Sequence, residues 1–171
     1  DFLENINRIY IVACGTAMNA GLATKATFEK LCKIPTEVDI ASEFRYRDPL
    51  IDKNTLCIFI SQSGETADTI AALKLSKDKG AKTIAVANVI GSSITRESDY
   101  CIYTHAGPEI AVASTKAYTS QVVLLNILAL YFAEVLDRVP LSEIDAIKKE
   151  LLELPKKAEL ALKNVAEVKD F

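Results

Sequence analysis

Short apolar runs alternate along this chain with longer segments in which apolar residues recur every three or four positions. Apolar runs of four to eight residues, bounded by turn-forming residues, are typical of strands buried on both faces. We expect such strands at residues 8–13, 36–40, 55–61, 82–89 and 100–104. The longer spacing predicts helices at residues 18–31, 66–79 and 115–136. Strands that alternate with helices form parallel sheets covered on both faces, so the pattern predicts a three-layer α/β sandwich around a five-stranded parallel sheet.

The pattern changes near Pro140. Residues 141–171 are rich in Lys, Glu and Leu, lack strand signals and contain a second break at Pro155. We interpret residues 1–140 as one domain and residues 141–171 as two helices that lead out of it. The chain also starts without Met and ends in a charged segment, which favours a piece of a larger protein.

Composition narrows the classes of function. The chain of 171 residues has a formal net charge of −3, 7% aromatic residues and no Trp, so a nucleic acid is not the expected partner. The longest apolar stretch, Val122–Val135, is shorter than the roughly 20 residues of a membrane span and predicts a buried helix. Four Cys residues and one His have no zinc-site spacing, and no signal peptide precedes them. We therefore expect reduced thiols, a cytoplasmic location and neither metal nor cofactor.

The segments that follow four of the expected strands are short and rich in small or hydroxyl side chains: Cys14–Ala17, Ser61–Thr66, Gly91–Ser93 and a loop ending in Val112–Thr115. Ligands of parallel sheets bind beyond the carboxyl ends of the strands, where helix N-termini attract anions. Ser61, Ser63 and Thr66 are expected to converge on one phosphoryl group, with Gly64 allowing the turn. Plain helix capping is the alternative for any single loop. Walker and dinucleotide-binding glycine patterns are absent from the sequence.

Acid–base and nucleophilic groups are sparse near these loops. Cys14 could pair with the single histidine, His105, but the small side chain of Cys14 also suits a pocket wall. Glu109 and Lys116 flank the last loop, where either an acid–base role or a surface ion pair is open. Residues 42–47 (SEFRYR) combine charge with aromatic side chains, and an interdomain contact is favoured over phosphate binding there.

Five segments together resemble a known family: Cys14–Thr16, Ala41–Arg47, Ser61–Thr66, Arg96–Asp99 and Val112–Lys116. The Ser-Gln-Ser-Gly-Glu-Thr run resembles the phosphosugar signature of sugar-isomerase (SIS) domains. The five segments, in this order, are similar to the first SIS domain of the glucosamine-6-phosphate synthase family. The similarity extends over residues 8–136.

The resemblance implies a set of substrate-binding residues: Cys14, Gly15, Thr16, Ala17, Ser61, Gln62, Ser63, Thr66, Val112 and Ser114. Ala17 departs from the family pattern, in which many members have Ser. One hydrogen bond to the ligand is then missing or made by water, which should weaken binding without abolishing it.

The resemblance further implies one half of an isomerase that binds fructose 6-phosphate or glucosamine 6-phosphate. The full aminotransferase would draw ammonia from a glutaminase domain and take its acid–base residues from a second SIS domain, so no catalytic residue is expected in this chain. We also expect a homodimer, because the helix at 115–136 is more apolar than one sheet face requires. Two alternatives remain: a non-catalytic phosphosugar-sensing module, and a complete isomerase or deglycase with Glu109 or His105 as base.

Overall fold

Five parallel strands form the centre of the computed structural model, which describes residues 2–110, 114–163 and 165. Their order in the sheet is β2-β1-β3-β4-β5. The strands are β1 (Arg8–Ala13), β2 (Thr36–Ile40), β3 (Thr55–Ser61), β4 (Lys82–Ala87) and β5 (Tyr100–Tyr103). The register places Ile9 of β1 opposite Thr36 of β2 and Leu56 of β3. The predicted parallel sheet is confirmed, and each strand lies within two residues of its expected bounds.

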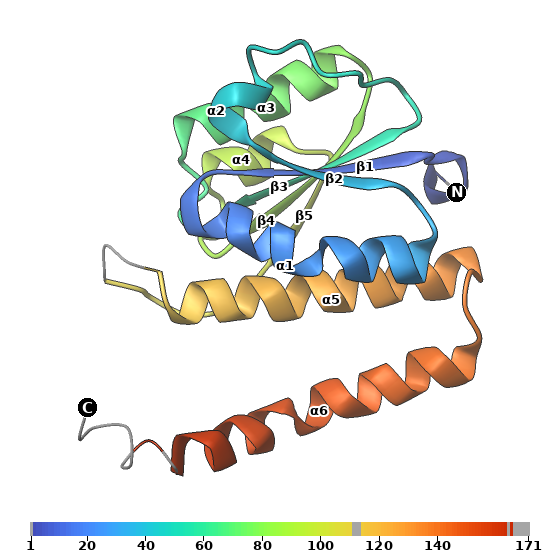
Figure 1. Cartoon of the computed structure of the whole chain (residues 1–171). Coiled ribbons are helices and arrows are strands. Elements are labelled where there is room, and N and C mark those ends of the chain that lie inside the picture. The colour runs from blue at the N-terminus through green and yellow to red at the C-terminus, as the bar shows by residue number, and fades with distance from the viewer. Residues whose placement is uncertain (1, 111–113, 164, 166–171) are drawn as a thin grey trace.

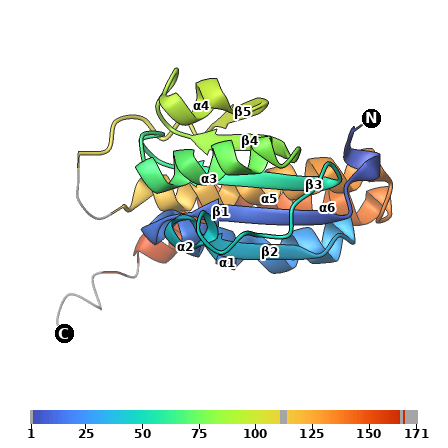
Figure 2. The same cartoon turned by 90° about the horizontal axis from the view of Figure 1, so that it is seen from above.

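Helices cover both faces of this sheet (Figures 1 and 2). The helices of the chain are α1 (Gly15–Cys32), α2 (Ala41–Phe44), α3 (Ala67–Asp78), α4 (Ser93–Glu97), α5 (Lys116–Leu136) and α6 (Leu141–Lys163), with a 3₁₀ turn η1 (Phe2–Asn5) at the start. The last of them, α6, packs on α5. The helices α1 and α5 pack side by side on one face, and α2, α3 and α4 lie on the other. This arrangement is the predicted three-layer α/β sandwich.

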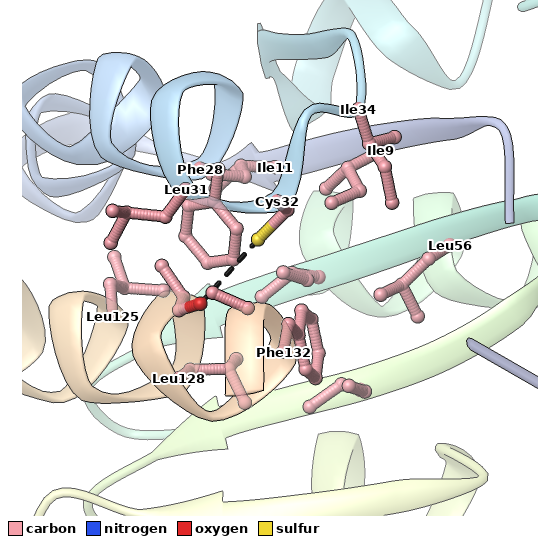
Figure 3. Packing of buried hydrophobic residues seen from close by; sticks show 14 of the residues in the cluster. Ile9, Ile11, Phe28, Leu31, Cys32, Ile34, Leu56, Leu125, Leu128 and Phe132 are labelled. Atoms are coloured by element: carbon pink, nitrogen blue, oxygen red, sulfur yellow. Dashed lines mark hydrogen bonds between the residues drawn. The ribbon is translucent and has the colours of Figure 1, made fainter. Parts of the chain in front are cut away.

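Alternating side chains of the strands feed two separate cores. Along β1, Ile9 and Ile11 face α1 and α5, whereas Tyr10 and Val12 face the opposite layer. Figure 3 shows the larger core, in which Phe28 of α1 meets Phe132 of α5 edge to face, with ring centroids 6.2 Å apart. This apolar contact between α1 and α5 helps to hold α5 in position against α1 and the sheet.

One sulfur is part of the larger core. The thiol of Cys32 donates to the carbonyl oxygen of Ala129 at 3.5 Å (Figure 3), and burial raises its pKa to about 12. All four Cys residues carry free thiols, and Cys57 lies buried in the opposite core. The two buried thiols therefore serve as small apolar side chains in the packing.

Two predicted helices differ from the observed ones. The first was expected from Met18, but α1 begins at Gly15, because the small residues interpreted as a loop form its first turn. The tail was expected to form two helices, but α6 is a single helix that continues through Pro155. A proline costs a helix one backbone hydrogen bond and introduces strain, but it does not always end the helix. The start of α6 packs back on α5, with Ile144 buried and Lys148 donating to Glu134 at 2.7 Å.

Among the described residues, α5 is the one helix with the length and composition to cross a membrane. Core helices pass the same test, and α5 packs against α1 and contributes Leu125, Ala129 and Phe132 to the larger core. We therefore assign α5 to the protein core, in agreement with the expected buried helix.

Candidate functional site

The candidate site lies where the connections of the sheet diverge. From β1 the chain passes through α1 to β2, whereas from the neighbouring strand β3 it passes through α3 to β4. Because α1 and α3 cover opposite faces, the loops after β1 and β3 separate at the carboxyl edge of the sheet (Figure 1). Such a switch point is where open parallel sheets bind their ligands.

A polar pocket of about 180 Å³ opens at this point. Its lining includes eight of the ten predicted substrate-binding residues: Cys14, Thr16, Ala17, Ser61, Gln62, Ser63, Thr66 and Ser114. Gly15 does not line the pocket but begins α1 with a positive φ of 56°. Val112 lies outside the described residues. Ile60 and Gln121 line the pocket as well and were not predicted.

The loop after β3 folds on itself through its hydroxyl groups. The Ser61 hydroxyl accepts the backbone N–H of Gly64 at 3.0 Å and lies 3.1 Å from the Thr66 hydroxyl. The Ser63 hydroxyl accepts the N–H of Glu65 at 3.2 Å. Three hydroxyl groups thus lie within one tight turn. We call residues 61–66 the cradle loop.

Two helix N-termini meet at the pocket. Cys14 is the N-cap of α1 and Thr66 is the N-cap of α3, and within the described structure neither side chain forms a capping hydrogen bond. The first N–H groups of a helix have no partner inside the helix, and they carry a partial positive charge. Among the described residues that line the pocket, none is Lys, Arg or His. An anion would therefore be held by hydroxyl groups and helix ends rather than by a cation.

The third predicted loop supports the cradle loop and does not line the pocket. Ile94 of α4 donates its N–H to the carbonyl of Gly64 at 3.0 Å, and the N–H of Ser93 donates to the Glu65 carboxylate at 2.7 Å. Hydrogen bonds from Ser93 lower the pKa of Glu65, and the charge of Arg96 acts in the same direction. The residues Gly91–Ser93 therefore do not line the pocket, and they contact the cradle loop from behind.

Of the candidates for acid–base or nucleophilic roles, Glu109 and His105 do not line the pocket, whereas Cys14 does. Glu109 accepts the backbone N–H of Thr115 at 2.9 Å at the start of α5; this bond is the main cause of a lowered pKa. His105 is exposed, and its ring is tilted by 60° relative to that of Tyr103, with ring centroids 6.2 Å apart. Cys14 accepts a long hydrogen bond from Thr69 at 3.9 Å. In the described part of the chain, the lining thus offers no carboxylate or imidazole as a general base.

The profile of the SIS domain family matches residues 2–131. The chain belongs to the SIS domain family. It is 63% identical over 160 residues to a protein of Clostridium tetani named glutamine–fructose-6-phosphate aminotransferase (isomerizing), and 58% identical over 169 residues to its namesake in Clostridium acetobutylicum. These matches cover 94% and 99% of the chain but 26% and 28% of the relatives, so the chain spans about a quarter of their length.

Solved structures agree with this assignment. The C-terminal domain of glucosamine-fructose-6-phosphate aminotransferase from Francisella tularensis superposes with a TM-score of 0.95 at 42% identity. The match covers 99% of this chain and 48% of that domain. Glucosamine-6-phosphate deaminase from Thermotoga maritima shares the fold with a TM-score of 0.76 at 23% identity, over 96% of this chain and 50% of its own.

The two arginines of the segment 42–47, Arg45 and Arg47, form ion pairs within the chain. Arg45 donates to the Asp68 carboxylate of α3 at 2.8 Å, and its guanidinium lies 4.7 Å from the ring centroid of Tyr46. Arg47 pairs with Asp39 at the end of β2. Both guanidinium groups are thus partnered within the SIS fold, and neither lines the polar pocket.

Gln121 is the lining residue of the SIS pocket that sequence reasoning missed. It lies on α5 in the buried stripe that contains Ala117, Leu125 and Leu128, and it is 2% exposed. A polar amide in an otherwise apolar stripe was the available signal. Whether this amide belongs to the pocket or only to the helix depends on how close α5 lies to the cradle loop, and the local sequence does not encode that distance.

An apolar surface flanks the β5 edge of the SIS sheet. A hollow of about 460 Å³ lies between η1, β5 and α5, and another of about 480 Å³ lies between α5 and α6. Ile127 and Tyr131 line both hollows and are 47% and 57% exposed. We call this region the lateral apolar surface. Contiguous apolar surface on this scale commonly marks an interface.

Proposed function

We propose that this chain is the first SIS domain of an isomerising glutamine–fructose-6-phosphate aminotransferase and binds the phosphate end of its sugar substrate. The names of the relatives support the enzyme class, and the 48% coverage of the Francisella domain fits one of two similar halves. The pocket, which joins three hydroxyl groups to two helix N-termini, is the observation that carries the proposal.

The proposed contribution of this chain is to hold the substrate rather than to transfer protons. The full enzyme would form glucosamine 6-phosphate and glutamate, with a general acid–base step between C1 and C2 of the opened sugar. The described lining lacks a carboxylate or imidazole for that step, which supports acid–base groups from a second SIS domain. Fixing the phosphate places the reacting carbons within reach of those groups, and such positioning lowers the barrier.

The proposed assembly follows from the apolar surface and the tail. Residues 1–140 would be the SIS domain, in keeping with the family match to residues 2–131, and residues 141–171 would connect it to the second SIS domain. The lateral apolar surface would be covered by that domain and by a second copy of the chain in a homodimer. The glutaminase domain would belong to the same full-length chain, which we expect in the cytoplasm.

Calorimetric titration tests the binding proposal. Fructose 6-phosphate and glucosamine 6-phosphate should bind this chain without turnover, and unphosphorylated fructose should not. Ser63→Ala should weaken binding about two- to ten-fold, because one hydrogen bond to the phosphoryl group is lost. Ser98→Ala is the matched control, because Ser98 contacts the carbonyl of Thr95 and lies outside the pocket. Absence of binding at millimolar phosphosugar, or equal affinities for Ser63→Ala and wild type, would refute the proposal.

Light scattering tests the assembly proposal. The chain should be dimeric at micromolar concentration, and Tyr131→Glu should shift it toward monomer, because a carboxylate would be buried in the interface. Tyr46→Glu makes the same substitution at a tyrosine that is 75% exposed and lies outside the lateral apolar surface, so it should leave the dimer intact. A monodisperse wild-type monomer at high concentration would contradict the homodimer.

A further inference from the structure

Gln121 lines the candidate pocket from the helical layer opposite α3. It lies in the second turn of α5, among the buried residues of that helix, and α5 packs against α1 (Figure 1). The hydroxyl groups of the cradle loop, by contrast, precede α3 on the other face. A ligand in the pocket would therefore meet the cradle loop from one layer and Gln121 from the other.

The side chain of Gln121 is almost fully buried at the pocket wall, and its amide lacks a partner in the described part of the chain. Gln121 is only 2% exposed, and its amide forms no hydrogen bond with a residue that the structure describes. Other polar side chains in helices behave differently. The amide of Asn126 donates to Val122 at 2.8 Å, and Ser76 donates to Ala72 at 2.9 Å. Buried polar groups are normally hydrogen-bonded, so an exception indicates a ligand or a functional constraint.

We propose that Gln121 is a further substrate-binding residue, whose amide forms a hydrogen bond with the phosphosugar. The inference rests on the proposed function of the pocket. An amide offers two N–H donors and a carbonyl acceptor, which match phosphate oxygens and sugar hydroxyls. The described lining holds no cation, so each neutral donor carries a larger share of the recognition. Gln121 thereby completes the enclosure of the ligand from the α1–α5 layer.

Replacement by an apolar side chain of similar length separates binding from structure. In Gln121→Met the buried unpartnered amide is lost, so the melting temperature without ligand should stay the same or rise. The dissociation constant of glucosamine 6-phosphate should increase about three- to ten-fold. Asn126→Met on the same helix is the matched control. It removes a hydrogen bond that exists, so its melting temperature should fall while its affinity stays at the wild-type value.

Two ligands locate the contact. Gln121→Met is titrated with inorganic phosphate and with glucosamine 6-phosphate. If the affinities for both ligands fall, the amide contacts the phosphate; if only the affinity for glucosamine 6-phosphate falls, the amide contacts the sugar. Both results support the inference. Wild-type affinity in Gln121→Met, together with normal binding by the wild type, would overturn the inference alone. A wild-type chain that binds neither ligand would overturn the proposed function and this inference together. A fall in melting temperature with unchanged affinity would assign Gln121 a purely structural role.

Discussion

Gly64→Ala is the substitution that the structure predicts to be most damaging to the cradle loop. Gly64 has a φ of +71°, a conformation that side chains disfavour. A Cβ atom at this position would lie 2.0 Å from the Ser92 hydroxyl oxygen and 2.5 Å from its Cβ atom. Both distances are far shorter than a van der Waals contact, so either the cradle loop or the start of α4 must move.

The expected loss of stability has two parts. The left-handed backbone conformation costs an alanine about 1–2 kcal/mol. The clash adds the cost of overpacking a buried position, about 1–3 kcal/mol. The sum of roughly 2–5 kcal/mol should lower the melting temperature of a chain of this length by roughly 4–20 °C. Phosphosugar binding should be lost at the same time, because Gly64 and its N–H shape the turn that holds Ser61.

Gly91→Ala separates strain from clash. Gly91 has the same φ of +71°, but a Cβ atom there would meet nothing within 4 Å. Gly91→Ala should therefore cost only about 1–2 kcal/mol. Calorimetric melting of both variants and of the wild type gives the difference directly.

A second substitution tests which atoms cause the clash. In Gly64→Ala/Ser92→Gly the two closest atoms are removed, while a 3.1 Å contact with Ile94 remains. Glycine at the N-cap of α4 costs a few tenths of a kcal/mol, and the Ser92 hydroxyl has no hydrogen-bond partner among the described residues. The double variant should therefore recover about 1–3 kcal/mol relative to Gly64→Ala. Equal destabilisation by Gly64→Ala and Gly91→Ala, or no recovery in the double variant, would refute the close-approach argument.

Three further predictions use other groups of the site. Ala17→Ser should tighten glucosamine 6-phosphate binding about two- to ten-fold in calorimetry, because a hydroxyl is restored to the pocket; weaker binding would contradict this. The N–H of Thr115 lowers the pKa of Glu109 in the folded protein. The stability that the Glu109 carboxylate contributes at the start of α5 is therefore present above its unfolded pKa of about 4.3, and it is lost as the pH falls through its folded pKa. Glu109→Gln should therefore flatten the decline of melting temperature below about pH 5; an unchanged decline argues against the cap. Iodoacetamide should label Cys14 and Cys101 but not Cys32 and Cys57, because burial raises the pKa of these two thiols to about 12. Phosphosugar should protect Cys14 alone, since Cys14 lines the pocket. Equal labelling of Cys14 with and without ligand would show that Cys14 does not belong to the site.

The strands and the cradle loop could be predicted from sequence because their signals are local. All seven residues of β3 are buried, and such continuous apolar runs separate clearly from their polar surroundings. The carboxyl ends of parallel strands share one edge, so the positions of the strands in the sequence sufficed to place the loops after β1 and β3 together. Seven of the ten predicted residues, all at or after the ends of these two strands, line one pocket for this reason.

The errors arise where structure depends on distant contacts or on weak local preferences. Gly15, Thr16 and Ala17 suit either a loop or the first turn of a helix, and their helical state follows from the packing of α1 on the sheet. The sequence of Gly91–Ser93 cannot distinguish a loop that touches a ligand from one that supports its neighbour. Gln121 is separated from the cradle loop by more than 50 residues, and only the docking of α5 brings the two together.

The residues of the pocket are suited to binding a ligand and not to transferring protons. Under the proposed function, this domain would hold the phosphate and a second domain would supply the acid–base groups. A phosphate held by hydroxyl groups and helix ends is fixed in place without a cation that would compete for nearby acid–base groups. Binding energy from this non-reacting group can then serve to orient the reacting carbons, which belong to the other end of the sugar. The described lining lacks a carboxylate or imidazole, so under the proposed function those carbons would extend toward groups contributed from outside the pocket. In the proposed enzyme a partner domain would complete the site, and the exposed Ile127 and Tyr131 would offer a surface on which that partner docks.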